Sequence, residues 1–363
     1  MEIAFRILRY ILLFSLGYLM YVIGALVIGT IQDFKPAPKL NLTVDQKGGI
    51  PTIADSSLSF VTWNVGYGGL GEESDFFFDG GGMLFSGGKM VRPDQPIVEK
   101  NVAGAEQFVE TTQSPFFLLQ EVDRESKRSY FINQYDRFRA KRPDYMSTFS
   151  VNYRVNRVPL PVFEPWQVYG KVESGLATLS TYQATENTRY QLPGEYPWPT
   201  RIFQLDRCAS LHRYPTEWGP DLVVINAHLS AFDKGGVLKA QQMTFLKELL
   251  IEEYKKGNYV VVGGDWNQLP PYFPEDAFQP NVPGYDAINI DPDFMPEGWV
   301  WAYDTQVPTN RSVRTPYDKE KSFKTLIDFF LLSPNIQLKK VRGINMEFQF
   351  ADHQPVYVEV ELR

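Results

Sequence analysis

The sequence predicts an α/β layered domain behind one apolar N-terminal helix, and three observations carry this prediction. Strand-like runs recur along the chain with helical patterns between them, which is the element order of an α/β fold. Several runs are apolar throughout, as expected for strands covered on both faces of a sheet. The N-terminal region also contains a long stretch without charge. The strand-like runs are 58–65, 116–122, 175–180, 221–229, 259–267, 325–333 and 356–362.

The uncharged stretch runs from Tyr10 to Ile31, and its 22 residues are enough to cross the hydrocarbon core of a bilayer, roughly 30 Å thick. Two arginines precede it and two lysines follow it, so the charge signal for orientation is weak. An uncleaved signal-anchor, a cleaved signal peptide and a buried core helix are the alternatives. No small-x-small cleavage site follows the stretch, and its three glycines suit a membrane helix. We therefore expect residues 1–31 to anchor the chain, with the folded domain on the extracytoplasmic side.

Residues 32–57 contain Pro, Lys, Asp and Gly with little periodicity, and they are interpreted as a linker. A flexible linker of this length would keep the domain within roughly 25–30 Å of the bilayer. Residues 58–363 show no internal repeat and no second boundary, so we expect one domain. Its clearest helical pattern covers 234–256, where apolar residues recur at the spacing of one helix face.

Composition excludes some function classes. The chain has 36 Lys and Arg against 43 Asp and Glu, so it lacks the basic excess of proteins that coat nucleic acid through bulk charge. The one cysteine, Cys208, excludes an intrachain disulfide and any cysteine-rich metal site.

Polar residues interrupt or follow the strand-like runs at several points, which would gather them at one edge of the sheets. A polar residue after a strand is often only a turn former, and this reading stays open for Asn64 and Asp352. Asp328 is different because apolar residues flank it on both sides, and a buried carboxylate needs a partner. His353 is a plausible partner. The full set is Asn64, Glu121, His228, Asp265, Asn267, Asp328, Asp352 and His353.

Taken in order, the segments TWNVG, LLQEVD, SGLATLS, NAHLS, GGDWN, LIDFFLLS and ADHQP resemble the endonuclease/exonuclease/phosphatase superfamily of metal-dependent phosphoesterases. The resemblance covers essentially all of 58–363. It implies a four-layer α/β sandwich, in which two mixed β-sheets pack face to face with helices outside. It also implies an active site at one edge of the sandwich.

The resemblance assigns a role to each matching residue. Glu121 looks like the principal metal carboxylate, with Asn64 and Asp352 in the metal region. These hard oxygen ligands suit Mg²⁺ or Mn²⁺, as one or two ions. Asp265 and Asn267 resemble the pair that orients the attacking water and holds a phosphate oxygen.

The remaining roles concern the histidines and one arginine. His353 matches the family histidine at the scissile phosphate, and Asp328 matches its orienting carboxylate. His228 matches a second histidine of the deoxyribonuclease, sphingomyelinase and phosphatase branches. Independently of the resemblance, Arg207, the neighbour of Cys208, is a candidate for binding the substrate phosphate. Whether Asp265 or His353 takes the proton of the water stays open.

These residues favour a membrane-tethered, Mg²⁺-dependent phosphodiesterase or phosphatase that acts on a lipid or a small phosphoester, and we expect a monomer. An extracytoplasmic nuclease of deoxyribonuclease type is the alternative, and a catalytically dead binding module is the third reading. Two segments bear on the choice. The basic and aromatic segment 124–157 is either a solvated helix or a surface for an anionic substrate. The aromatic run Phe76–Phe78 either dips into a membrane or packs under its loop.

Overall fold

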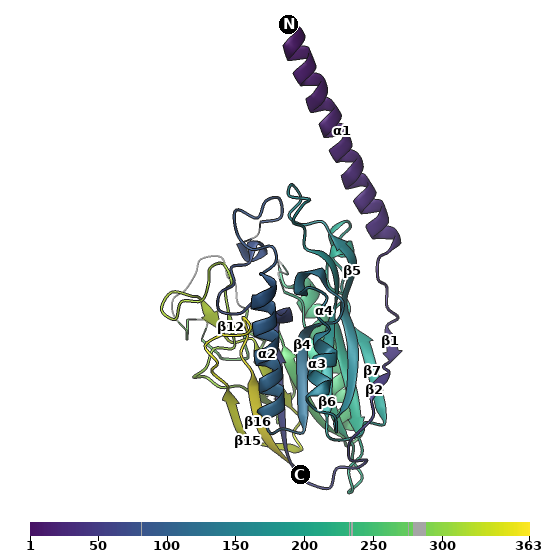
Figure 1. The fold of residues 1–363 in the computed structure, drawn as a ribbon. Coiled ribbons are helices and arrows are strands. Elements are labelled where there is room, and N and C mark those ends of the chain that lie inside the picture. Colours follow the sequence, from purple (N-terminus) through teal and green to yellow (C-terminus); the bar gives the residue numbers. More distant parts are fainter. Residues whose placement is uncertain (81, 232, 234, 275, 279–287) are drawn as a thin grey trace.

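The structure, a computed structural model, describes residues 1–80, 82–231, 233, 235–274, 276–278 and 288–363 (Figure 1). Two seven-stranded mixed sheets form its centre. The first has the order β1 (Lys39–Asn41), β7 (Glu186–Gln191), β8 (Cys208–Tyr214), β9 (Leu222–His228), β10 (Tyr259–Asp265), β14 (Asp328–Leu332) and β11 (Val300–Ala302). The second has the order β15 (Ile336–Gly343), β16 (Val356–Leu362), β3 (Ser57–Asn64), β4 (Phe116–Asp123), β6 (Gly170–Ser180), β5 (Met146–Val158) and β2 (Val44–Gln46).

Outside the sheets lie four α-helices of the described chain: α1 (Glu2–Ile31), α2 (Gln95–Thr111), α3 (Gln134–Ala140) and α4 (Val237–Lys255). Two short strands, β12 (Asn310–Arg311) and β13 (Lys324–Thr325), form a separate ladder. The predicted helix at 234–256 corresponds to α4, and all seven strand-like runs overlap observed strands. The sequence pattern placed Asp328 inside a strand, but Asp328 is the first residue of β14 and therefore lies at the start of that strand.

Apolar side chains fill the three spaces between four layers. Phe60 and Phe116 of the second sheet stack at 4.6 Å between ring centres and pack against Phe330 of the first sheet. Helix α4 covers the outer face of the first sheet through Leu246 and Leu250. The outer face of the second sheet packs against α2 and α3. This α–β–β–α order confirms the predicted four-layer sandwich.

The directions of the strands bring one set of strand ends from each sheet to the same end of the molecule. These strand ends together are called the polar edge. β3 runs parallel to β4, and β9 runs parallel to β10, so all four end at this edge. β14 and β16 run antiparallel to them and begin there. β16 then leads to the C-terminus at the far end, whereas α1 leaves the domain near the edge (Figure 1).

The interpretation of 32–57 as a free linker is wrong, because this segment is part of the domain. β1 pairs with β7 at the edge of the first sheet, and β2 pairs with β5 at the edge of the second. Ile53 is fully buried between the sheets. Each of these strands has only three residues, too few to show an alternating pattern in sequence.

The aromatic run Phe76–Phe78 packs under its own loop. Phe77 is buried, and the ring of Phe76 lies 5.8 Å from that of Tyr169. All three rings belong to one apolar cluster with Tyr67 and Val172. The run therefore does not form the membrane-dipping tip that the sequence left open.

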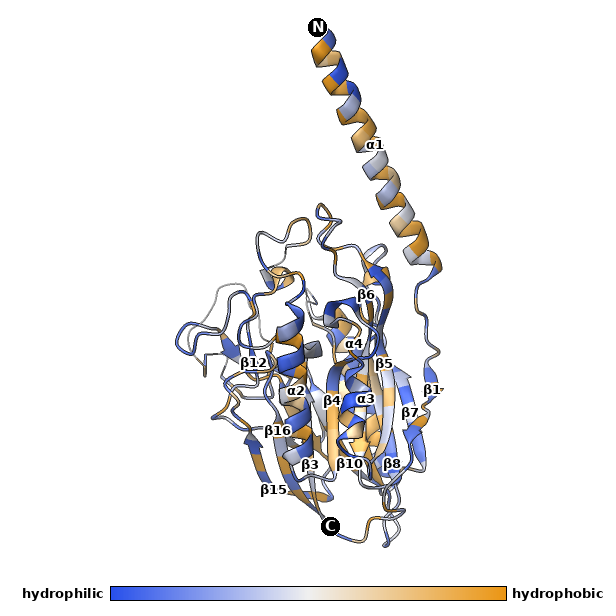
Figure 2. Cartoon of the chain, viewed as in Figure 1, coloured by the Kyte–Doolittle hydropathy of each residue, from blue (hydrophilic) through white to orange (hydrophobic). Residues whose placement is uncertain are grey.

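Helix α1 projects from the domain, and none of its residues is buried (Figure 1). It is long and apolar enough to cross a membrane, and it is mostly apolar along its exposed surface (Figure 2). Its C-terminal half contacts the domain. The Tyr18 hydroxyl donates to the carbonyl of Val162 at 2.7 Å, and the Trp198 indole donates to the Thr30 hydroxyl at 3.2 Å.

Candidate active site

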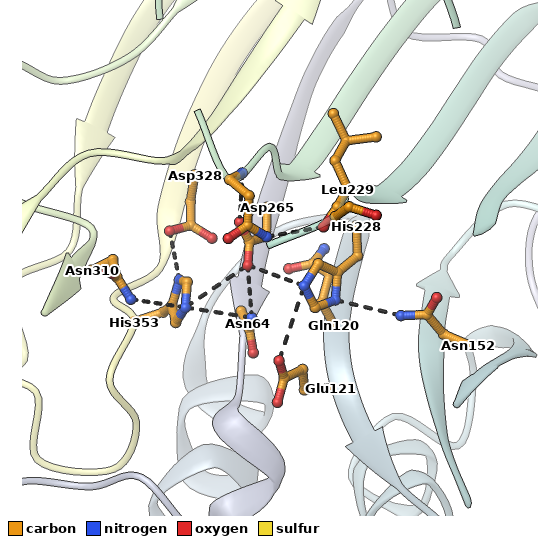
Figure 3. Close-up of polar contacts among 12 residues, drawn as sticks. Asn64, Gln120, Glu121, Asn152, His228, Leu229, Asp265, Asn310, Asp328 and His353 are labelled. Atoms are coloured by element: carbon orange, nitrogen blue, oxygen red, sulfur yellow. Dashed lines mark hydrogen bonds and ion pairs between the residues drawn. The ribbon is translucent and has the colours of Figure 1, made fainter. Parts of the chain in front are cut away.

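The polar residues that interrupt the strands meet at the shared edge of the two sheets (Figure 3). In the first sheet, Asp265 stands opposite His228 of β9 on one side and Asp328 of β14 on the other. In the second sheet, Asn64 ends β3 beside β4. Strand pairing therefore sets the positions of these residues along the strands, independently of their side-chain contacts.

His353 and Asp328 form the pair that the sequence predicted. Nδ1 of His353 lies 2.8 Å from Oδ2 of Asp328, and both side chains are buried. The backbone N–H of Asp328 donates to the Thr309 hydroxyl, which holds the start of β14 in place. On the far side of the ring, Nε2 lies 3.0 Å from the amide Nδ2 of Asn310, which donates to a neutral ring; a ring protonated at Nε2 would instead face the amide oxygen of Asn310. The carboxylate thus orients the imidazole so that Nε2 points into the site.

The charges around His353 favour its protonated form. Burial alone would lower its pKa, but Asp328, Asp352 and Asp265 together raise the pKa of His353 well above its usual value. Burial also opposes ionisation of Asp328 and raises its pKa. The pair therefore retains one proton between Nδ1 and Oδ2 across the neutral range.

Asp265 lies at the centre of the cluster. Its Oδ2 accepts a hydrogen bond from Nδ2 of Asn64 at 3.0 Å and lies 3.3 Å from Nε2 of His228 and 3.8 Å from Nε2 of His353. Burial would raise its pKa, but the two histidines and Asn64 hold the pKa of Asp265 well below its usual range. The carboxylate is consequently ionised at neutral pH.

His228 favours its neutral form, in contrast to His353. Burial, followed by the positive charge of Arg207, lowers the pKa of His228. Its Nε2 faces Asp265, and its Nδ1 lies 3.5 Å from the amide nitrogen of Asn152. The neutral ring with hydrogen on Nε2 satisfies both contacts, since Asn152 then donates to Nδ1. The two histidines of the site are therefore held in different charge states.

A break in strand pairing directs Glu121 into the site. The register between β4 and β6 shifts between Leu119 and Val122, and Glu121 has a φ of 54°. Such a bulge re-aims a side chain at the cost of local backbone strain. One carboxylate oxygen lies 4.0 Å from Nε2 of His228. Its side chain is part-exposed, in contrast to the buried Asp265.

Asp352 faces the same space and is the best indicator of a cation there. Its Oδ1 is buried and has no hydrogen-bond partner among the described residues. Burial and the nearby charge of Glu121 raise the pKa of Asp352 to about 7. A cation beside these two side chains would stabilise the ionised form of Asp352. Glu121, Asp352 and the Asn64 amide oxygen therefore fit a hard divalent ion.

A second group of potential ligands lies deeper. Asp265, Asp328 and His353 offer ligand atoms within 4.8 Å of one another. Because Nδ1 of His353 already bonds Asp328, the hydrogen-bonded pair explains this closeness without an ion. Glu121 and Asp352 are therefore the better candidates for metal ligands.

Cationic side chains border the site on the side of the first sheet. Nη1 of Arg207 is buried without a hydrogen-bond partner among the described residues, and its guanidinium senses the charges of Glu121 and Asp265. Lys239 of α4 is buried, and its ammonium donates to the carbonyl of Asn267 at 3.2 Å. These donors are placed to bind an anionic group.

Asn267 lies in a tight turn after β10. Its backbone N–H donates to Oδ1 of Asp265 at 2.9 Å, its φ is 50°, and its side chain donates to the carbonyl of Leu229 at 3.0 Å. This Asx turn fixes Asn267 beside Asp265.

The structure brings every candidate residue of the sequence to this one edge and adds three more. Asn310, Asn152 and Lys239 contact His353, His228 and Asn267, respectively, and no sequence motif marks them. Asn310 belongs to a two-residue strand, and Lys239 lies in the first turn of α4. The third histidine, His212, is buried in β8 and bonds Asn187, outside the site.

Solved structures share this fold. The endonuclease/exonuclease/phosphatase from Bacteroides vulgatus superposes with a TM-score of 0.50 and 18% identity, over 85% of this chain and 99% of that one. ANGEL2, a 2',3'-cyclic phosphatase in complex with adenosine-2',3'-vanadate, has a TM-score of 0.53 and 13% identity, over 90% and 99%. The human Nocturnin catalytic domain with bound sulfate has values of 0.50 and 14%, over 86% and 97%.

Neither a protein-family model nor a curated protein sequence matches the chain. The fold nevertheless matches these solved structures over at least 85% of this chain. The chain therefore has the endonuclease/exonuclease/phosphatase fold.

Proposed function

We propose that the protein is a metal-dependent phosphoester hydrolase that α1 tethers to a membrane. The observation that carries this proposal is the convergence of three groups: an ionised Asp265, a His353 that is held by Asp328 and favours its protonated form, and a buried nitrogen of Arg207 that has no partner among the described residues. Hydrolysis at phosphorus needs a positioned water, charge neutralisation on the phosphate and a proton for the leaving oxygen. The fold and the phosphatase among its neighbours add support.

Each residue has a distinct task in this proposal. Arg207 and Lys239 bind the non-bridging oxygens of the substrate phosphate. Asp265 is ionised before the reaction, orients the attacking water by accepting its hydrogen bond, and takes the proton that this water loses as its oxygen bonds to phosphorus. His353, with Nδ1 held by Asp328, donates from Nε2 to a phosphoryl or leaving oxygen. Mg²⁺ or Mn²⁺ bound near Glu121 and Asp352 would offset further negative charge as a Lewis acid.

A lipid or small phosphoester is the proposed substrate, because the site and α1 lie at the same end of the molecule (Figure 1). The segment that follows α1 is fixed to the domain, because β1 pairs with β7 and β2 pairs with β5. A site presented toward the bilayer meets headgroup phosphates at high local concentration. The domain would lie on the extracytoplasmic side.

The nuclease alternative needs segment 124–157 to be a free basic and aromatic surface, and its contacts do not favour this. Arg128 is buried against Asp123, Arg137 pairs with Glu99 and Glu106, and Arg154 pairs with Glu173. Most of its aromatic rings are core residues; those buried are Tyr135, Phe138, Tyr145, Phe149 and Tyr153. Stacking platforms for single-stranded nucleic acid require exposed rings.

A substrate panel tests the proposal. Purified full-length protein in liposomes is assayed with Mg²⁺ and with a chelator against sphingomyelin, phosphoinositides, a chromogenic phosphodiester and DNA. We expect Mg²⁺-dependent hydrolysis of lipid or small phosphoesters that His353→Gln lowers by about 10²–10⁴. His212→Gln serves as the matched control, because His212 is a buried histidine outside the site. Robust DNA cleavage without hydrolysis of the other substrates would favour the nuclease, and no turnover of any substrate would favour a binding module.

A further inference from the structure

Two loops join at the end of the domain that carries the site, and they expose a set of large apolar side chains. These side chains, called the apolar tip, are between 42% and 74% exposed and comprise Met83, Leu84, Phe85, Phe163 and Trp166. In Figure 1 the two loops are the dark-blue and teal loops that rise beside α1. Contiguous exposed apolar surface of this kind marks an interaction site in most proteins.

The apolar tip is a built structure. The backbone N–H groups of Val162 and Phe163 donate to the carbonyls of Met83 and Leu84 at 2.9 and 3.0 Å. The rings of Phe85 and Phe163 lie 5.2 Å apart between centres. The polar groups at the base of the loops are also satisfied, since Glu164 accepts hydrogen bonds from Ser86 and Gln167. The loops therefore present their apolar side chains outward without leaving these backbone groups unpaired.

The apolar tip also contacts α1 directly. The Tyr18 hydroxyl donates to the carbonyl of Val162 at 2.7 Å, and its ring lies 5.6 Å from that of Phe163. Tyr18 stands 13 residues before Ile31, which corresponds to about 20 Å of helix. Side chains that meet α1 at Tyr18 therefore share the depth of its apolar residues.

Two neighbouring features extend the same surface. An open apolar cleft of about 420 Å³ lies between α1 and Trp198, which is itself largely exposed. Three cationic side chains, Lys127, Arg92 and Arg157, also lie close together. Burial and the charges of the two arginines lower the pKa of Lys127. Arg157 also donates to the Tyr21 hydroxyl of α1 at 3.2 Å. Apolar residues bordered by basic ones match the boundary between acyl chains and anionic headgroups.

We propose that the apolar tip inserts into the lipid bilayer that α1 spans. The proposal rests on the membrane anchoring stated under Proposed function. It names two loops, and not Phe76–Phe78, as the membrane contact. Insertion of the tip holds the polar edge of the sheets toward the headgroups, which selects substrates embedded in the bilayer over soluble ones.

Depth-dependent fluorescence on the full chain tests insertion. Leu84→Cys and Trp166→Cys are labelled with an environment-sensitive dye, and native Cys208 is fully buried, which protects it from labelling. Trp218→Cys is the control, because Trp218 bonds Tyr259, whose hydroxyl bonds the C-terminal Arg363 at the far end. In liposomes of phosphatidylcholine and phosphatidylglycerol, brominated lipids should quench both tip probes at least about twofold and leave the control unchanged. Tip probes that report water would overturn the proposal.

A kinetic comparison separates this inference from the function itself. The double variant Phe85→Ser/Trp166→Ser should lower the hydrolysis of a bilayer-embedded phosphoester roughly tenfold or more, because both substitutions remove apolar surface that enters the membrane. Hydrolysis of a soluble phosphodiester should stay unchanged. Equal loss on both substrates would contradict insertion. If the unmodified protein hydrolyses neither, the proposed function fails, and the fluorescence result alone decides the position of the tip.

Discussion

Replacement of Asp328 by Asn tests the arrangement around His353. The variant removes the negative charge 2.8 Å from Nδ1 of His353 and offers an amide that can donate to Nδ1. A hydrogen bond to a charged group contributes about 1.5–3 kcal/mol, which corresponds to a rate loss of roughly 10- to 150-fold. Reversal of the tautomer would increase the loss, because Nε2 would no longer be held in its working form. We therefore expect a total loss of about 10²–10⁴ in kcat.

The assay combines kinetics with a direct measurement on the histidine. Hydrolysis of a soluble phosphodiester is measured for Asp328→Asn, His353→Ala and the double variant, with the exposed Asp293→Asn as control. The double variant should be little worse than either single one, because the two residues act as a unit. NMR titration should show that the pKa of His353 falls in Asp328→Asn. Activity within about threefold of the unmodified protein, or multiplicative losses in the double variant, would refute the reasoning.

Three further predictions concern the metal, the substrate phosphate and stability. Glu121→Ala should abolish Mg²⁺-dependent activity, and calorimetry should show weaker binding of Mn²⁺; undiminished turnover in excess chelator would contradict this role. Arg207→Met should raise KM at least about tenfold by loss of a charged contact to phosphate, with folding checked by circular dichroism; an unchanged KM would exclude that contact. Burial opposes ionisation of Glu253, but Arg213 and other donors lower its pKa from 4.5 to about 2. Its stabilisation, at most about 3 kcal/mol, is therefore present above pH 4.5 and lost as pH falls toward 2. Glu253→Gln should flatten this part of the stability curve, and an unchanged acid dependence would argue against the ion pair.

Strong local signals in the sequence predict an α/β layered domain and a set of polar residues at strand ends, whereas the four-layer order and the roles of the site residues came from the family resemblance. Apolar runs mark the central strands, and polar residues at their ends mark the active edge. Asp328 could be paired with a histidine in advance, because a carboxylate among apolar neighbours must have a partner. The structure confirms that pairing.

Other features depend on tertiary placement and leave no local pattern. β1 and β2 are three-residue edge strands whose pairing partners lie far along the chain, so a free linker was the natural interpretation. Asn310 reaches His353 because an antiparallel bridge brings these two residues together, although they are distant in sequence. The apolar tip joins loops that are far apart in sequence, whereas the conspicuous run Phe76–Phe78 packs inward.

The most direct test of the central claim is the initial rate of phosphodiester hydrolysis by the full-length protein with Mg²⁺, compared with that of His353→Gln. The account predicts turnover that a chelator abolishes and that the variant lowers by about 10²–10⁴. Equal rates for the two proteins, or no Mg²⁺-dependent turnover by the unmodified protein, would contradict it.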